Sequence, residues 1–184
     1  EYSRLHSHLL WFGLFADALG FESVFMNAWR IRELVLDELE ATTGGRVIQG
    51  SCKVGGVRRD IPGETLDAMR GRLDGLEKEI RSLSDAFLRD SSVKSRLCGV
   101  GPLSREQAHT LGAVGPTARG SGVDNDIRRT GYAAFDRIRF TPALESAGDC
   151  YARTMVRVNE MHASIDMIRE AIGNITRFHR KSIP

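Results

Sequence analysis

Residues 66–87 read LDAMRGRLDGLEKEIRSLSDAF, and their apolar side chains recur at alternating spacings of three and four residues. The recurring positions are Leu66, Met69, Leu73, Leu76, Ile80, Leu83 and Phe87. This spacing places all seven side chains on one face of a helix for three heptads. We therefore predict a long helix from about Glu64, just after Pro62-Gly63, to about Asp90.

Helical spacing also precedes this segment. We predict helices over residues 2–19 and 21–42, ended by Gly20 and by Gly44-Gly45. The first is apolar on nearly all sides after Leu9, which is typical of a buried helix. The second should carry an acidic outer side formed by Glu33, Asp37, Glu38 and Glu40.

Two further helices are expected in the second half of the chain. Ser104-Arg105-Glu106-Gln107 is a capping box that predicts a short helix ended by Gly112. Asp149 should cap a long helix over residues 150–175. The remaining residues, 177–184, are basic and are predicted to be a disordered tail.

Three segments lack helical spacing. Residues 46–61 predict a loop with short extended pieces at Val47-Ile48 and Lys53-Val54. Residues 112–129 are glycine-rich and predict irregular structure, and Arg137–Thr141 alternates like a strand. The predicted fold class is mainly α with minor β, with long antiparallel helices and a short strand and loop region in one domain over residues 1–176.

Composition excludes several classes of protein. The 184 residues include 26 Lys and Arg against 24 Asp and Glu, which is too balanced for a nucleic-acid partner to be expected. The longest apolar run, Leu9–Ala16, is too short to cross a membrane. Cys52, Cys98 and Cys150 form no CxxC pair, so we expect reduced thiols and no metal site. His6 and His8 point away from one another on a helix and cannot bind one metal together.

Two glycine-rich loops carry the most conspicuous charges. In Gly55-Gly56-Val57-Arg58-Arg59-Asp60, the charged residues form either a solvated turn with an Arg–Asp pair or an arginine clamp for an anionic group or a partner subunit. In residues 115–129, Arg119, Asp126 and Arg128 could form a buried ionic cluster that organises a site or an interface. The alternative for that segment is a flexible surface loop.

Five ordered motifs together resemble a known family. They are Ser7-His8-Leu9-Leu10-Trp11-Phe12-Gly13, Phe25-Met26-x-Ala28-x-Arg30-x-Arg32-Glu33, Gly55-Gly56-Val57-Arg58-Arg59-Asp60, Gly115-Pro116-x-x-Arg119-x-Ser121-Gly122-x-x-x-Asp126-x-Arg128, and Gly148-Asp149-Cys150-Tyr151-x-Arg153-x-x-Val156-Arg157. In this order and spacing they resemble the large subunit of membrane-bound, energy-converting nickel–iron hydrogenases and its relative, the D-type subunit of NADH:quinone oxidoreductase (complex I). The resemblance runs from residue 1 to about residue 175.

The resemblance implies a middle fragment of the nickel–iron hydrogenase large-subunit fold that packs on an iron–sulfur small subunit and on other subunits of the complex. It implies a peripheral subunit on the cytoplasmic side of the membrane, reaching the membrane only through partners. It places Arg58, Arg59, Asp60, Arg119, Asp126 and Arg128 toward the partner or its cluster. No catalytic residue is expected within this fragment.

The resemblance leaves the branch of the family open. Hydrogenase members hold nickel and iron between two CxxC motifs, whereas complex I members bind quinone and obtain electrons from NADH through partner subunits. This chain has neither CxxC, and Arg96-x-Cys98-Gly99-x-Gly101 lacks the second cysteine of the nickel motif that it resembles. The hydrogenase branch is favoured by Met26–Arg30 and Arg58–Ile61. We expect a redox subunit that couples electron transfer to ion translocation, with a non-catalytic helical scaffold as the alternative.

The isolated chain is expected to form a homodimer. The argument is that the apolar face of residues 66–87 and the first helix would lie exposed without segments that cover them. Pairing of two copies would remove that exposure.

Overall fold

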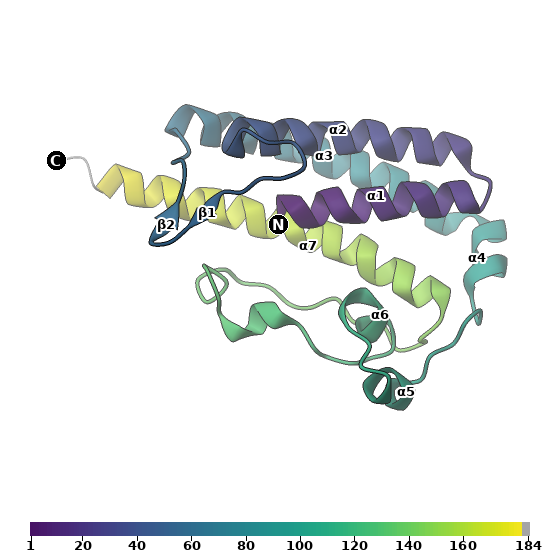
Figure 1. Ribbon diagram of the computed structural model, residues 1–184. Helices are drawn as coiled ribbons and strands as arrows, with labels where there is room; N and C mark the ends of the chain where they lie inside the picture. The colour runs from purple at the N-terminus through teal and green to yellow at the C-terminus, as the bar shows by residue number, and fades with distance from the viewer. Residues whose placement is uncertain (182–184) are drawn as a thin grey trace. The chain divides into compact units, whose positions relative to one another are not determined.

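The computed structural model describes the backbone of residues 1–181 and the side chains of residues 1–175 (Figure 1). The fold class is confirmed, because the described chain is mainly helical with one small antiparallel sheet. It divides into two compact units, which we describe separately. The first contains residues 1–83 and the chain from Ser164 onward, and the second contains residues 84–163.

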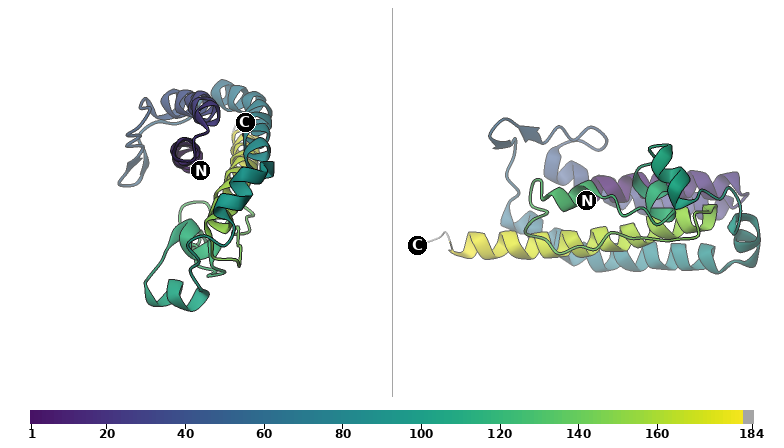
Figure 2. Two further views of the ribbon diagram at one scale, coloured as in Figure 1. Left: turned by 90° about the vertical axis from the view of Figure 1, so that its right-hand side faces the viewer. Right: turned by 90° about the horizontal axis from the view of Figure 1, so that it is seen from below.

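The first unit begins with two antiparallel helices. α1 (Tyr2–Ala18) and α2 (Glu22–Thr43) lie side by side (Figures 1 and 2). They approach closely at Gly13, where an added Cβ would lie 3.1 Å from the ring of Trp29. The prediction that α1 is buried on nearly all sides is wrong at Leu14, which is 51% exposed.

α3 (Gly63–Arg89) matches the predicted long helix to within about one residue at each end. All seven apolar positions that predicted it are buried in the chain, with exposed fractions of 0–6%. The expectation that this face is exposed and available to a second copy is therefore wrong. The chain itself provides the cover that a homodimer was expected to supply.

A small hairpin connects α2 to α3. β1 (Cys52–Lys53) pairs with β2 (Gly56–Val57) in antiparallel register, Cys52 opposite Val57. The predicted extended piece at Lys53-Val54 therefore corresponds to a strand end and the following turn. Val47-Ile48 does not form a strand.

The second unit is built from short helices that lead into a long one. After the end of α3 it contains α4 (Ser91–Leu97), α5 (Arg105–Thr110), α6 (Gly115–Gly120), the 3-10 helix η1 (Ile127–Thr130) and the first part of α7 (Cys150–Lys181). The capping box is confirmed, since the Ser104 hydroxyl accepts from the Gln107 amide at 3.1 Å and the Gln107 side chain accepts from the Ser104 amide at 3.0 Å. Residues 112–129 are less irregular than expected because they include α6 and η1.

The predicted strand at Arg137–Thr141 is wrong. Arg137 and Ile138 form a bend and residues 139–141 have no regular structure, with the Arg137 amide donating to the carbonyl of Ala134 at 3.0 Å. An isolated alternating segment has no strand to pair with here, and the ring of Phe140 instead lies 4.7 Å from the guanidinium of Arg128. The apolar residue Phe140, which contributed to the alternating pattern, is therefore explained by its contact with Arg128.

Two findings concern the whole of the described chain. No helix within residues 1–181 is both long enough and apolar enough to cross a membrane. α7 is helical to Lys181, whereas residues 182–184 and the side chains of residues 176–181 lie outside what the structure describes. The predicted disorder of the tail 177–184 stays a prediction.

Candidate functional site

Two exposed arginines directly follow the hairpin of the first unit, whose backbone is closely defined. α2 ends at Thr43, and Gly44 adopts the left-handed conformation with φ of 81°. Val54 and Gly55 form the two-residue connection between the strands, and Gly55 has φ of 86°. The amide of Arg58 donates to the carbonyl of Ser51 at 2.8 Å, so the pairing continues to the first arginine.

Arg58, Arg59 and Asp60 are exposed and follow β2 directly. Within residues 1–175 none of the three forms an ion pair, which removes the interpretation as a turn closed by an Arg–Asp pair. The Asp60 carboxylate accepts from the amide of Ile61 at 2.9 Å instead. Arg59 lies over Gly44, where an added Cβ would be 2.9 Å from its Nη1. This places a cation at the carboxyl end of α2, which the helix dipole favours.

The connection between α2 and α3, which contains the hairpin, exposes apolar side chains. Val54 at the turn is fully exposed, and Ile48 before β1 is 88% exposed. Val47 and Val57 are 64% and 58% exposed. Apolar side chains grouped with arginines on one projecting loop are typical of a protein interface.

The second unit holds a buried ion-pair cluster. Arg119, Asp126 and Arg128 have exposed fractions of 4%, 8% and 1%, so the predicted buried ionic cluster is confirmed. Asp126 accepts from Nη2 of Arg128 at 2.6 Å and from its Nε at 2.9 Å. Arg119 donates through Nε to Oε1 of Glu160 at 2.7 Å, and its Nη1 lies 3.6 Å from Oδ2 of Asp126. The guanidiniums are therefore turned into the chain, and they shape the loop rather than form its surface.

The two arginines of this cluster keep the Asp126 carboxylate ionised. Burial by itself raises the pKa of Asp126, but the hydrogen bonds from Arg128 and the positive charges of Arg128 and Arg119 outweigh it and lower that pKa to about 2. Asp126 is thus ionised throughout the neutral and mildly acidic range. A buried Arg–carboxylate arrangement of this kind is stable only with such complete hydrogen bonding.

A third set of contacts fixes the start of α7. Asp149 accepts from the amide of Ala152 and from the amide of Gly99, both at 2.7 Å. Arg153 donates to the carbonyls of Gly148 at 2.7 Å and Gly101 at 2.9 Å. The motif Gly148-Asp149-x-x-x-Arg153 therefore fastens the loop over residues 99–101 to the helix, which is a structural role.

Sequence reasoning missed Glu160, which is 1% exposed and completes the ion-pair cluster. A signal was present: Glu160 lies four residues after Val156 and four before Ser164, on the buried side of α7. An acidic residue inside an otherwise buried stripe predicts a buried cationic partner.

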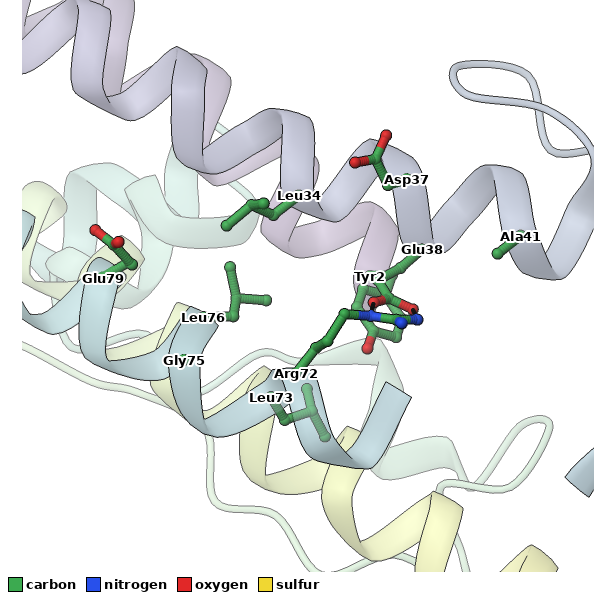
Figure 3. Close-up of a pocket in the computed structure, with 10 residues that line it drawn as sticks. All are labelled: Tyr2, Leu34, Asp37, Glu38, Ala41, Arg72, Leu73, Gly75, Leu76 and Glu79. Carbon is green, nitrogen blue, oxygen red and sulfur yellow. Dashed lines mark hydrogen bonds and ion pairs between the residues drawn. The ribbon is translucent and has the colours of Figure 1, made fainter. Parts of the chain in front are cut away.

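The first unit also contains a groove of about 550 Å³ between α2 and α3 (Figure 3). Figure 3 shows Glu38 and Arg72 facing each other at one end, where they form a two-pronged ion pair. Glu38 was predicted on the acidic outer side of α2, and this is wrong because it is 4% exposed. Burial and then the charge of Glu38 raise the pKa of Tyr2, so its hydroxyl stays protonated. The other two carboxylates at the groove, Asp37 and Glu79, are also paired with arginines.

The cysteines do not fit a nickel–iron centre. Such a centre requires four thiolates, and the chain has three cysteines, of which Cys52 lies in the first unit and Cys98 and Cys150 in the second. Within residues 1–175 no three His, Cys, Asp or Glu side chains are grouped as metal ligands.

The chain resembles subunits of respiratory dehydrogenases in sequence. It is 38% identical over 176 residues to the D-type subunit of the F(420)H(2) dehydrogenase of Methanosarcina mazei, covering 95% of this chain and 47% of the relative. It is 39% identical to the fused C/D-type subunit of the NADH-quinone oxidoreductase of Phocaeicola vulgatus and 40% identical to a D-type subunit of the same kind of enzyme from Rhizobium etli. These two matches cover 95% of this chain and 34% and 44% of the relatives. The chain thus spans less than half the length of these relatives.

A solved structure supports the same relationship. The described fold matches a chain of the membrane-bound sulfane sulfur reductase, an archaeal respiratory membrane complex, with a TM-score of 0.87 and 28% identity over 94% of this chain and 47% of that chain. The family model for the respiratory-chain NADH dehydrogenase 49 kDa subunit matches residues 18–182. The chain therefore belongs to the family of the respiratory-chain NADH dehydrogenase 49 kDa subunit.

Proposed function

We propose that this chain is the helical framework of a D-type subunit in a membrane-associated respiratory oxidoreductase. In this proposal the hairpin with Arg58 and Arg59 packs on an iron–sulfur partner subunit. The complex transfers electrons from a reduced carrier and couples the transfer to ion translocation. The family membership and the relatives named NADH-quinone oxidoreductase and F(420)H(2) dehydrogenase support it.

The observation that carries the proposal is the exposed hairpin. Arg58 and Arg59 have no counter-charge within residues 1–175. Val54 at the turn is fully exposed, and Ile48 in the same connection between α2 and α3 is 88% exposed. Arginine combined with apolar side chains is the composition of an interface core. Asp60 belongs to the same surface and would provide a carboxylate for a cation of the partner.

Arg119, Asp126 and Arg128 act differently in this proposal. They are buried, so they hold residues 115–130 in one conformation and present that loop to the partner. Their contribution is the shape of the surface. The charge that reaches the partner comes from the hairpin.

The proposed location is the cytoplasmic side of the membrane, with the membrane reached through partner subunits. Quinone or another acceptor, NADH and any nickel–iron centre belong in this proposal to parts of the complex outside these residues. None of the relatives named above is a hydrogenase, so the preference for the hydrogenase branch receives no support from them. The proposed partners are other subunits, because the chain itself buries the face of residues 66–87, one of the two surfaces on which the homodimer prediction rested.

The test is a charge reversal in the intact complex. Arg58→Glu should lower the fraction of the chain recovered with the iron–sulfur partner, because it places a carboxylate where a cation is required. Lys78→Glu is the matched control, since Lys78 is an exposed cation of α3 that forms no ion pair within residues 1–175.

Normal assembly and electron transfer with Arg58→Glu would overturn the proposed role of the hairpin. A non-catalytic scaffold gives a different result: complexes that contain the chain would form, and removal of the chain would leave electron transfer unchanged.

A further inference from the structure

Arg32 is a buried cation that has no counter-charge within residues 1–175. Its side chain lies on α2 beside α1 and is 8% exposed. Its contacts are the imidazole of His6 and the ring of Trp29, whose centroid lies 5.1 Å from the guanidinium carbon. The other two arginines that are buried within residues 1–175, Arg119 and Arg128, both bind carboxylates. An uncompensated buried charge is strongly unfavourable, so Arg32 requires an explanation.

The hydrogen bonds around Arg32 show that an acceptor is missing. Nη2 of Arg32 lies 2.5 Å from Nε2 of His6. A guanidinium only donates, so the imidazole is the acceptor and is neutral. Nε of Arg32 and Nε1 of Trp29 are buried donors that have no acceptor within residues 1–175. Buried donors are paired in nearly all native structures.

The surface around this cation is aromatic and apolar. On α2, Phe25, Trp29 and Arg32 follow one another at spacings of four and three, and the rings of Phe25 and Trp29 are 5.5 Å apart. On α1, His6, Leu10 and Leu14 follow at spacings of four. We call these six residues the Arg32 flank. All except Arg32 are at least partly exposed, and Leu14 is 51% exposed.

We propose that the Arg32 flank binds an apolar segment of another subunit that carries an aspartate or glutamate, whose carboxylate pairs with Arg32. A carboxylate supplies both the missing negative charge and acceptor oxygens for a guanidinium. Trp and Arg in a partly buried setting are the residues that most often dominate binding energy at interfaces. A single recessed cation is unlike the cluster of exposed cations that attracts anionic lipids. The inference rests on the proposed function in taking the occupant from the same complex, but it concerns a surface separate from the hairpin.

The proposal predicts opposite effects of one substitution in two states of the protein. Arg32→Met removes the uncompensated charge and keeps most of the volume, so the isolated 184-residue chain should unfold at a higher temperature. In the complex the same change removes the anchor of the incoming carboxylate, and the recovered assembly should fall by about tenfold. Arg30→Met is the matched control, because Arg30 is exposed and is paired with Glu79 at 2.6 Å. It should change neither quantity appreciably.

The occupant is identified by a photo-reactive residue placed at Leu14 in the assembled complex. We expect a cross-link to another subunit near an acidic residue, and reversal of that residue to arginine should restore assembly to Arg32→Glu. A cross-link to a second copy of this chain or to lipid would overturn the proposal. A lower unfolding temperature of the isolated Arg32→Met chain would also overturn it, because His6 and Trp29 would then account for the arginine.

The two proposals fail separately. If Arg58→Glu prevents assembly while Arg32→Met assembles normally, this inference is wrong and the role of the hairpin stands. If Arg32→Met loses assembly while Arg58→Glu does not, the role of the hairpin is wrong and the Arg32 flank stands.

Discussion

Arg119 of α6 and Glu160 of α7 form an ion pair that is almost completely buried on both sides. Nη2 and Nε of Arg119 lie 2.5 Å and 2.7 Å from the same carboxylate oxygen. Next to this pair Gly120 packs on Arg153, where an added Cβ would lie 2.9 Å from Cγ. The charged contact and the close backbone approach together fix α6 on α7.

Removing the guanidinium should destabilise the chain strongly. Arg119→Met leaves the buried carboxylate of Glu160 without this partner, and the free energy of unfolding should fall by about 3–5 kcal/mol. The measurement is chemical denaturation. Arg119→Met combined with Glu160→Met should recover much of the loss, because the carboxylate that lost its guanidinium is removed as well. A single variant that loses less than the double variant would contradict this account.

Asp126 should make stability depend on pH in acid. Its folded pKa of about 2 lies below its ordinary value of 3.8, so its contribution to stability is complete above 3.8 and is lost as the pH falls toward 2. Asp126→Asn should lower stability at neutral pH and flatten the decline across that interval. The measurement is the urea midpoint at a series of pH values, and an unchanged slope would argue against the ionised pair.

Alanine substitutions at Gly44 and Gly20 should distinguish the effect of the contact with Arg59 from the effect of backbone strain. Both have φ near 80°, but only Gly44 lies under a guanidinium, while an added Cβ at Gly20 meets nothing within 4 Å. Changing either to alanine should cost roughly 1–2 kcal/mol of folding stability, because both positions are left-handed. Only Gly44→Ala should also reduce assembly, since it displaces Arg59. Equal assembly of both variants would show that the position of Arg59 is unimportant.

Gly71 and Gly120 should respond to alanine with opposite signs. Gly71 is exposed in the middle of α3 with nothing near an added Cβ, so Gly71→Ala should raise the free energy of unfolding by about 1 kcal/mol. Gly120→Ala should lower it, since the methyl group would collide with Arg153 of α7. Thermal unfolding of the two variants gives the comparison. Stabilisation by Gly120→Ala would mean that α6 and α7 are not tightly packed.

Signals within a few residues of the helix ends predicted α3, α5 and α7. The ends of α3 follow from the seven apolar positions together with Pro62-Gly63 and Asp90. The starts of α5 and α7 follow from the side-chain caps of Ser104 and Asp149. In each case the responsible atoms lie within a few residues of the structure that they determine.

Local signals also lie at the starts of α6 and α4, two short helices that the sequence analysis did not predict. Pro116 lies in the first turn of α6, a position that proline favours, yet the surrounding glycines suggested irregular structure. Asp90 caps α4 through the amides of Ser92 and Val93, directly after α3 ends.

Long-range partners account for what the sequence could not reveal. Glu38 is buried because Arg72, 34 residues later, binds it, and Glu160 because Arg119, 41 residues earlier, does so. Spacing on one helix identifies the face on which a carboxylate lies, but the cation that permits its burial comes from another helix. The hairpin surface shows the same limit: its sequence predicted charges, and only the fold shows that Arg58 and Asp60 do not neutralise each other.

The two hydrogen bonds that Asp149 accepts should couple the opening of two distant segments. One carboxylate holds the amide of Gly99 and the amide of Ala152, which lie 53 residues apart. Neither end can be released without weakening the other, so the first turn of α7 and the loop at residue 99 should open as one cooperative unit. In native-state hydrogen exchange these two amides should therefore share one opening free energy and respond together to denaturant, whereas an exposed loop amide such as that of Val54 should exchange independently.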